Sequence, residues 1–94
     1  MARRTLILRG PTYYSPGDEK AFFDWLLSIT CIEGVAGHLR DLHVTLKSQP
    51  GNLQLRDLFA LLGRYRMNVE QLSGLRTKRN AALFDQLRTL HKRK

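Results

Sequence analysis

Residues 32–47 read Ile-Glu-Gly-Val-Ala-Gly-His-Leu-Arg-Asp-Leu-His-Val-Thr-Leu-Lys, and this stretch decides the fold. Its second half alternates apolar and polar side chains, as an antiparallel strand does when one face is buried. A turn centred on Arg40 and Asp41 would pair the first half with the second. The pairs that this turn sets are Leu39 with Leu42, Gly37 with Val44, and Val35 with Leu46. All of them share one face, so the stretch predicts a hairpin.

Similar patterns on either side of the hairpin predict the other elements. Residues 5–9 are strand formers that end at a Gly-Pro turn. Residues 15–29 open with Ser-Pro-Gly-Asp, a typical helix start, and continue with apolar side chains at helical spacing. A second helix is predicted around Leu55–Leu62 and a short third around Leu83–Leu90. Residues 69–75 are assigned as a fourth strand with Leu72 inward, although several of them are poor strand formers.

This element order predicts an α+β fold of the ferredoxin-like βαββαβ type. Right-handed crossovers would place both long helices on one face of a four-stranded antiparallel sheet in the order 4-1-3-2. The third helix would then lie over a sheet edge or over the open face. We expect one domain, with the ferredoxin-like part at residues 1–79 and a basic C-terminal helix and tail of the same domain at residues 80–94.

Charge is distributed unevenly along the 94 residues, which carry a formal net charge of +8. From Arg76 onward there are seven basic residues and one acid, whereas the first 75 residues hold nine basic residues and seven acids. Such a basic end favours an anionic partner, and added solubility explains it equally well.

The single cysteine and the lack of a long apolar run indicate the compartment. Cys31 has no second thiol with which to form an internal disulfide, which favours a reducing environment. No apolar run approaches the roughly 20 residues that span a bilayer. The basic start is followed by an apolar stretch that Arg9 soon breaks, unlike a secretory signal. We expect a cytoplasmic protein of bacterial origin.

Metal binding and catalysis find little support in the sequence. His38 and His43 fall opposite each other in the predicted hairpin, but no third ligand alternates onto their face, so no metal is expected. No nucleophile elbow, zinc-protease motif or phosphate-binding loop is present. Cys31 is expected to be a buried, inert thiol. We therefore expect neither enzymatic activity nor a cofactor.

Two surfaces are candidates for binding. Tyr13 and Tyr14, on the loop after the first strand, form a candidate protein-contact patch, although one of them could instead pack against the helix start. A basic sheet face and tail form a candidate nucleic-acid surface. Its members are Arg9, His43, Lys47, Arg76, Lys78, Arg79, Arg88, Lys92, Arg93 and Lys94. The middle strands lack the aromatic side chains on which sheet-based RNA binders stack bases.

The sequence thus predicts a small, non-enzymatic binding protein. We expect a protein–protein interaction or regulatory module, such as an immunity-like or antitoxin-like partner or a subunit, with self-association through an edge strand or the open sheet face as one form of it. The alternative is low-specificity RNA binding through the basic sheet face and tail. A membrane partner is not expected.

Overall fold

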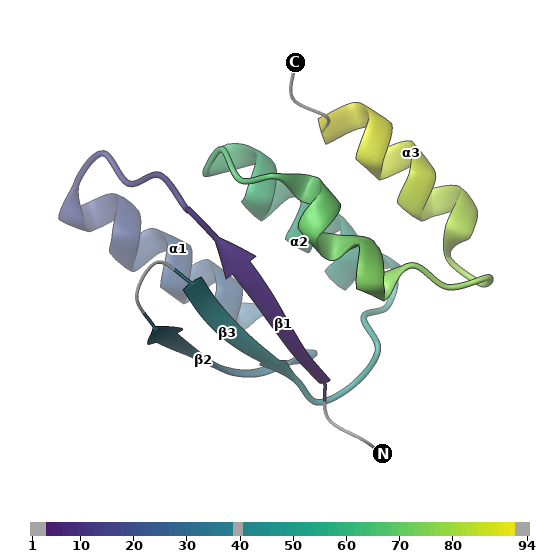
Figure 1. Cartoon of the computed structure of the whole chain (residues 1–94), viewed down its shortest axis with the longest axis horizontal. Coiled ribbons are helices and arrows are strands. Elements are labelled where there is room, and N and C mark those ends of the chain that lie inside the picture. Colours follow the sequence, from purple (N-terminus) through teal and green to yellow (C-terminus); the bar gives the residue numbers. More distant parts are fainter. Residues whose placement is uncertain (1–3, 39–40, 92–94) are drawn as a thin grey trace.

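A computed structural model describes residues 4–38 and 41–91 of the chain. Within these residues it contains three strands and four helices, one of them a 3₁₀ helix (Figure 1). The elements run in the order β1 (Arg4–Arg9), α1 (Pro16–Ser28), β2 (Ile32–His38), β3 (Asp41–Leu46), α2 (Asn52–Arg64), η1 (Val69–Leu75) and α3 (Ala81–His91). None of the helices in these ranges has the length and apolar character needed to span a membrane.

The sheet is antiparallel and has the order β1-β3-β2. Alternation along the strands buries one face, as the sequence predicts: Leu42, Val44 and Leu46 are inside, and the residues between them are partly exposed. The predicted hairpin register is wrong by two residues. His38 pairs with Asp41 and Val35 with Val44. The predicted turn residue Arg40 and the Leu39 half of the predicted Leu39–Leu42 pair lie outside the described residues.

The predicted fourth strand, and with it the four-stranded ferredoxin-like sheet of order 4-1-3-2, is wrong. Residues 69–75 form the 3₁₀ helix η1, whose side chains at positions i and i+3 lie on one side. Val69, Leu72 and Leu75 have this spacing and are all buried. The Asn68 side chain caps the helix by accepting a hydrogen bond from Glu70 N at 2.9 Å. The fold is a small α+β fold with three strands.

Helix α1 begins where the sequence predicts because Ser15 is its N-cap. The Ser15 hydroxyl accepts a hydrogen bond from Asp18 N at 3.2 Å, and Pro16 occupies the first helical position. Helix α2 ends in a left-handed turn at Arg66, with φ of 60°, and Met67 N donates back to Leu62 O at 2.8 Å. This is the Schellman arrangement, and it redirects the chain from α2 toward η1.

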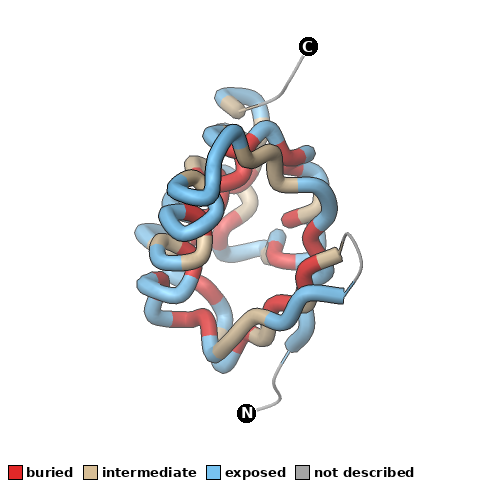
Figure 2. The backbone as a smooth tube through the Cα atoms, turned by 90° about the vertical axis from the view of Figure 1, so that its left-hand side faces the viewer, coloured by how far each residue is buried: buried red, intermediate tan, exposed pale blue. Residues whose placement is uncertain are grey.

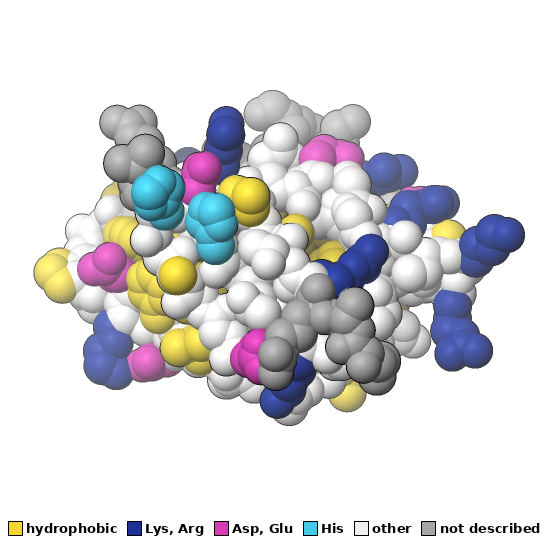
Figure 3. All heavy atoms as spheres, turned by 60° about the horizontal axis from the view of Figure 1, so that its bottom comes forward, with side chains coloured by type: hydrophobic (Ala, Val, Ile, Leu, Met, Phe, Trp, Pro, Cys, Tyr) yellow, Lys and Arg dark blue, Asp and Glu magenta, His cyan; other side chains and the backbone are white. Residues whose placement is uncertain are grey.

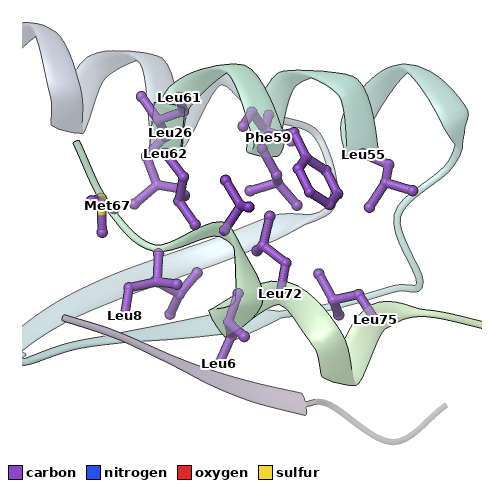
Figure 4. Close-up of a cluster of buried hydrophobic side chains, with 14 of the residues drawn as sticks. Leu6, Leu8, Leu26, Leu55, Phe59, Leu61, Leu62, Met67, Leu72 and Leu75 are labelled. Carbon is purple, nitrogen blue, oxygen red and sulfur yellow. The ribbon is translucent and has the colours of Figure 1, made fainter. Parts of the chain in front are cut away.

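The core lies between the sheet and the helices, and Figure 2 shows the buried positions facing this interior. Figure 4 shows how leucines of β1, α2 and η1 converge there, with Leu72 reaching from η1 into the space beneath α2. Helix α3 packs on α2 and η1, with the Phe59 and Phe84 ring centroids 5.0 Å apart, and contacts none of the three strands. It therefore lies over neither the open sheet face nor the β2 edge, contrary to prediction.

Candidate functional site

The open face of the sheet is polar with one apolar residue at its centre. Ile7, His43 and Ala36 are neighbours across the three strands, and Ile7 is 48% exposed. In the next row Arg9 contacts Asp41, with Nε 3.3 Å from Oδ1. This pair neutralises one of the cations that the sequence assigns to a basic sheet face. Figure 3, which views this side, shows most lysine and arginine side chains gathered away from the histidines.

His38 and His43 lie on this open face, although they are not directly paired across the strands. Their ring centroids are 6.1 Å apart and their planes are nearly perpendicular. Figure 3 shows two histidines side by side there. Across residues 4–38 and 41–91, no group of three histidine, cysteine or acidic side chains comes together in a way that would hold a metal ion.

The two sheet edges differ. On the outer side of β1, Arg9 N donates to the Gln71 side chain at 2.6 Å, and the Arg4 guanidinium donates to Gly74 O at 3.3 Å. Helix η1 thus covers the β1 edge. No strand pairs with the outer side of β2 in the described part of the chain. We call this outer side, at residues 34–38, the β2 edge.

Backbone groups of Val35 and Gly37 point outward at the β2 edge. In antiparallel pairs, alternate residues direct their N–H and C=O groups to opposite sides. Lys47 N donates to Cys31 O at 3.0 Å, so the odd-numbered residues of β3 face β2. The backbone N–H and C=O groups of their partners at positions 34, 36 and 38 are therefore directed toward β3, within the hairpin. Val35 and Gly37 are left with free hydrogen-bonding groups that an extended chain can use.

The segment that includes α1 and β2 has a net charge opposite in sign to the charge of the whole chain. Residues 11–38, which include α1 and β2, carry a single basic residue, Lys20, and four acids. These acids are Asp18, Glu19, Asp24 and Glu33. The positive charge thus belongs to the first ten residues and to the segment from residue 40 onward.

A hollow of about 460 Å³ opens beside the β2 edge, and we call it the α1–hairpin hollow. The residues around it are Gly10, Pro11, Tyr13, Glu19, Phe23, Gly37 and Leu42. Gly10, with φ of +70°, provides the turn that carries the chain from β1 to the near wall. The hollow therefore combines two aromatic rings with one carboxylate.

Tyr13 and Tyr14 occupy different environments. The Tyr13 ring packs edge-on against Phe22 and Tyr65, at centroid distances of 5.7 and 6.2 Å. Its hydroxyl is shielded from water and has no hydrogen-bond partner among residues 4–38 and 41–91. Burial, followed by the nearby charge of Glu19, raises the pKa of Tyr13 to about 12.

Tyr14 is 74% exposed on an ordered loop. The loop is held by Tyr14 N, which donates to Asp18 Oδ2 at 2.8 Å, and by Thr12 N, which donates to Tyr65 O at 3.0 Å. A smaller hollow joins Tyr14 to Arg64 and Tyr65 at the end of α2. The two tyrosines therefore do not form one patch, and Tyr14 lies apart from the lining of the α1–hairpin hollow.

The basic residues of the predicted nucleic-acid surface are dispersed. Arg76 makes two hydrogen bonds of 2.9 Å to the carboxylate of Asp85, and Arg88 lies 3.4 Å from the same carboxylate. Lys47, Lys78 and Arg79 are exposed at two separate loops. Lys92, Arg93 and Lys94 lie outside the described residues. The described cations do not line one groove.

The thiol of Cys31 is buried at the start of β2, and burial raises its pKa. A protonated, shielded thiol is a poor nucleophile at neutral pH. Cys31 therefore acts as a small core side chain in this fold.

Sequence reasoning missed Glu19 and Gly37 as site residues. The signal available for the β2 edge was the composition of residues 34–37, Gly-Val-Ala-Gly, which contains no lysine or proline. No signal could have joined Glu19 to Gly37, because their proximity depends on how α1 packs against the hairpin.

No family model matches the chain, no curated protein matches its sequence, and no solved structure matches its fold. The observations above therefore define the class by structure alone: a small α+β protein with a three-stranded antiparallel sheet and one uncovered edge.

Proposed function

We propose that the chain is a non-enzymatic protein-binding module and that the β2 edge receives its partner. One observation carries the proposal: η1 covers the β1 edge, whereas the outer side of β2 has no partner within the described residues. An extended segment of another protein would add a strand to the sheet and use the free groups of Val35 and Gly37.

The side chains beside this edge support a protein partner. Phe23 and Val35 are partly buried against the core, and Leu27, one turn after Phe23, is 50% exposed. Figure 3 shows hydrophobic side chains gathered near the histidines, on the part of the surface with few lysines or arginines. An apolar strip next to free backbone groups offers both the main-chain affinity and the side-chain contacts that strand addition requires.

The test is affinity capture from the host's lysate, with and without nuclease, using matched variants. Gly37→Pro removes an outward N–H, and Gly37 has no positive φ that would exclude proline. Gly34→Lys is a second edge variant, because a Cβ at Gly34 meets no atom within 4 Å. Ile7→Lys, on the open face, is the control that leaves the β2 edge intact.

We expect nuclease-resistant capture that both edge variants lose and Ile7→Lys keeps, with thermal melts confirming that each variant folds. Capture that nuclease abolishes, and that removal of residues 76–94 also abolishes, would support RNA binding instead. Capture that is equal for all variants would overturn the β2 edge as the binding surface.

A further inference from the structure

We infer that the α1–hairpin hollow binds the cationic end of an arginine or lysine side chain from the partner strand. The inference rests on the proposed function, because Gly37 belongs both to the β2 edge and to the wall of the hollow. A strand added at this edge would carry one of its side chains past Gly37. That side chain would enter between α1 and the hairpin.

The carboxylate of Glu19 gives the hollow its sign. Glu19 is exposed at its rim and forms no ion pair with any described residue, while its charge acts on the phenol of Tyr13. The neighbouring Asp18 is engaged at the loop, where it accepts from Tyr14 N. In a chain with a net charge of +8, an unpaired carboxylate beside two aromatic rings is a local site for a cation.

The rings of Tyr13 and Phe23 give the hollow its shape. A long basic side chain buries its methylene stem against apolar surface and keeps its charged head at a polar group. Guanidinium and ammonium groups are also attracted to the faces of aromatic rings. The two ring centroids are 6.5 Å apart, so one side chain can contact both.

The Tyr13 hydroxyl, on a residue that lines the hollow, has no hydrogen-bond partner among the described residues. A buried hydroxyl without a hydrogen bond is unfavourable and rare in native structures. With a pKa of about 12 the phenol stays neutral at physiological pH, so Glu19 supplies the only negative charge in the lining of the hollow. An arginine head group carries several donors that the exposed Glu19 carboxylate can accept, while its stem lies against the Tyr13 ring.

The volume fits one side chain. About 460 Å³ lies near the lower end of the range of small-ligand pockets, roughly 300–1,000 Å³. Two other hollows among the described residues, of about 240 and 150 Å³, each include an arginine of the chain itself, Arg64 and Arg4. The α1–hairpin hollow is the one of these three that has a carboxylate and no cation in its lining.

The probe is Nα-acetyl-arginine methylamide, with the norleucine analogue as a neutral counterpart of similar length. Backbone amide signals of Gly10, Phe23 and Gly37 are followed by NMR during titration of the full chain. We expect the arginine compound to shift these signals and the norleucine compound to bind at least about fivefold more weakly. Glu19→Gln should weaken arginine binding by at least about the same factor, and Asp57→Asn, an exposed acid on α2, should leave it unchanged.

Equal binding of the two compounds, or equal affinity of the wild type and Glu19→Gln, overturns the inference. Absence of shifts at Gly10, Phe23 and Gly37 at millimolar arginine compound also overturns it. These outcomes leave the proposed function open to its own test, because capture at the β2 edge is measured with Gly37→Pro and Gly34→Lys. Equal capture by the wild type, Gly37→Pro and Gly34→Lys, together with preserved arginine binding, would instead reject the strand-addition proposal.

Discussion

Replacing Leu72 with alanine measures how much η1 contributes to the core. The Leu72 side chain is fully buried, at 0% exposure, and Figure 4 shows it beneath α2 among the leucines of β1 and α2. Leucine-to-alanine changes at such sites cost about 2–5 kcal/mol, because the apolar contacts are lost and a cavity remains. We expect about 3 kcal/mol, a large share of the roughly 5–15 kcal/mol that stabilises a domain.

Urea unfolding followed by circular dichroism and by Trp25 fluorescence gives this free energy, and a thermal melt gives a second measure. A loss of about 3 kcal/mol corresponds to a fall in Tm of roughly 12–24 °C for a domain of this size. The control is Leu53→Ala on α2, which removes the same atoms from a side chain that is 75% exposed and should cost at most about 0.5 kcal/mol. If Leu72→Ala costs no more than Leu53→Ala, η1 does not pack in the core and the assignment of residues 69–75 is refuted.

Three further predictions concern single polar or titratable groups. Asn80→Ala should destabilise the fold by about 1–3 kcal/mol in urea unfolding. The reason is that the buried Asn80 side chain accepts a hydrogen bond from Thr77 N at 2.7 Å, and the substitution leaves that N–H unpaired. An unchanged urea midpoint would contradict this prediction. The hydrogen bond from Arg76 lowers the pKa of Asp85 in the folded protein. The stability that this pair adds is therefore present above the ordinary carboxyl pKa of about 4 and is lost as the pH falls through the lower folded pKa. The stability advantage of the wild type over Asp85→Asn should shrink below about pH 4, and a difference that stays constant with pH would refute this prediction. Burial raises the pKa of Cys31, so Ellman's reagent at pH 8 should react slowly with the native protein and rapidly in urea; equally fast reactions would show that the thiol is accessible.

The hairpin shows which part of a strand arrangement a hydrophobic pattern determines. Leu42, Val44 and Leu46 alternate, so their common buried face follows from sequence alone. The register does not, because side-chain direction repeats every two residues and a shift of two leaves every face unchanged. The observed register pairs His38 with Asp41 instead of the predicted His43, yet both histidines still lie on the open face.

The segment 69–75 shows how a short apolar pattern can be assigned the wrong period. The predicted strand with Leu72 inward would place Glu70 and Gly74 on the same buried side. Val69, Leu72 and Leu75 repeat every three residues instead, which is the period of a 3₁₀ helix. That repeat was visible in the sequence. The hydrogen bond from Arg9 N to the Gln71 side chain was not, because it joins residues 62 positions apart.

Helix η1 covers the β1 edge of the sheet and leaves the β2 edge as the one without a cover in the described part of the chain. Edge strands that must avoid association usually carry lysine, proline or charged side chains that point inward. Residues 34–37 of β2 are glycine, valine, alanine and glycine instead of charged residues or proline. The shift in pairing register between Ile32 and Gly34 affects only the beginning of the strand. Helix η1 covers the β1 edge through contacts of Gln71 and Arg4. Within the described residues, no strand pairs with the outer side of β2, and its centre carries no charged side chain. The two edges of the sheet therefore differ within the described residues, and this difference is the observation behind the proposal that β2 receives a partner strand.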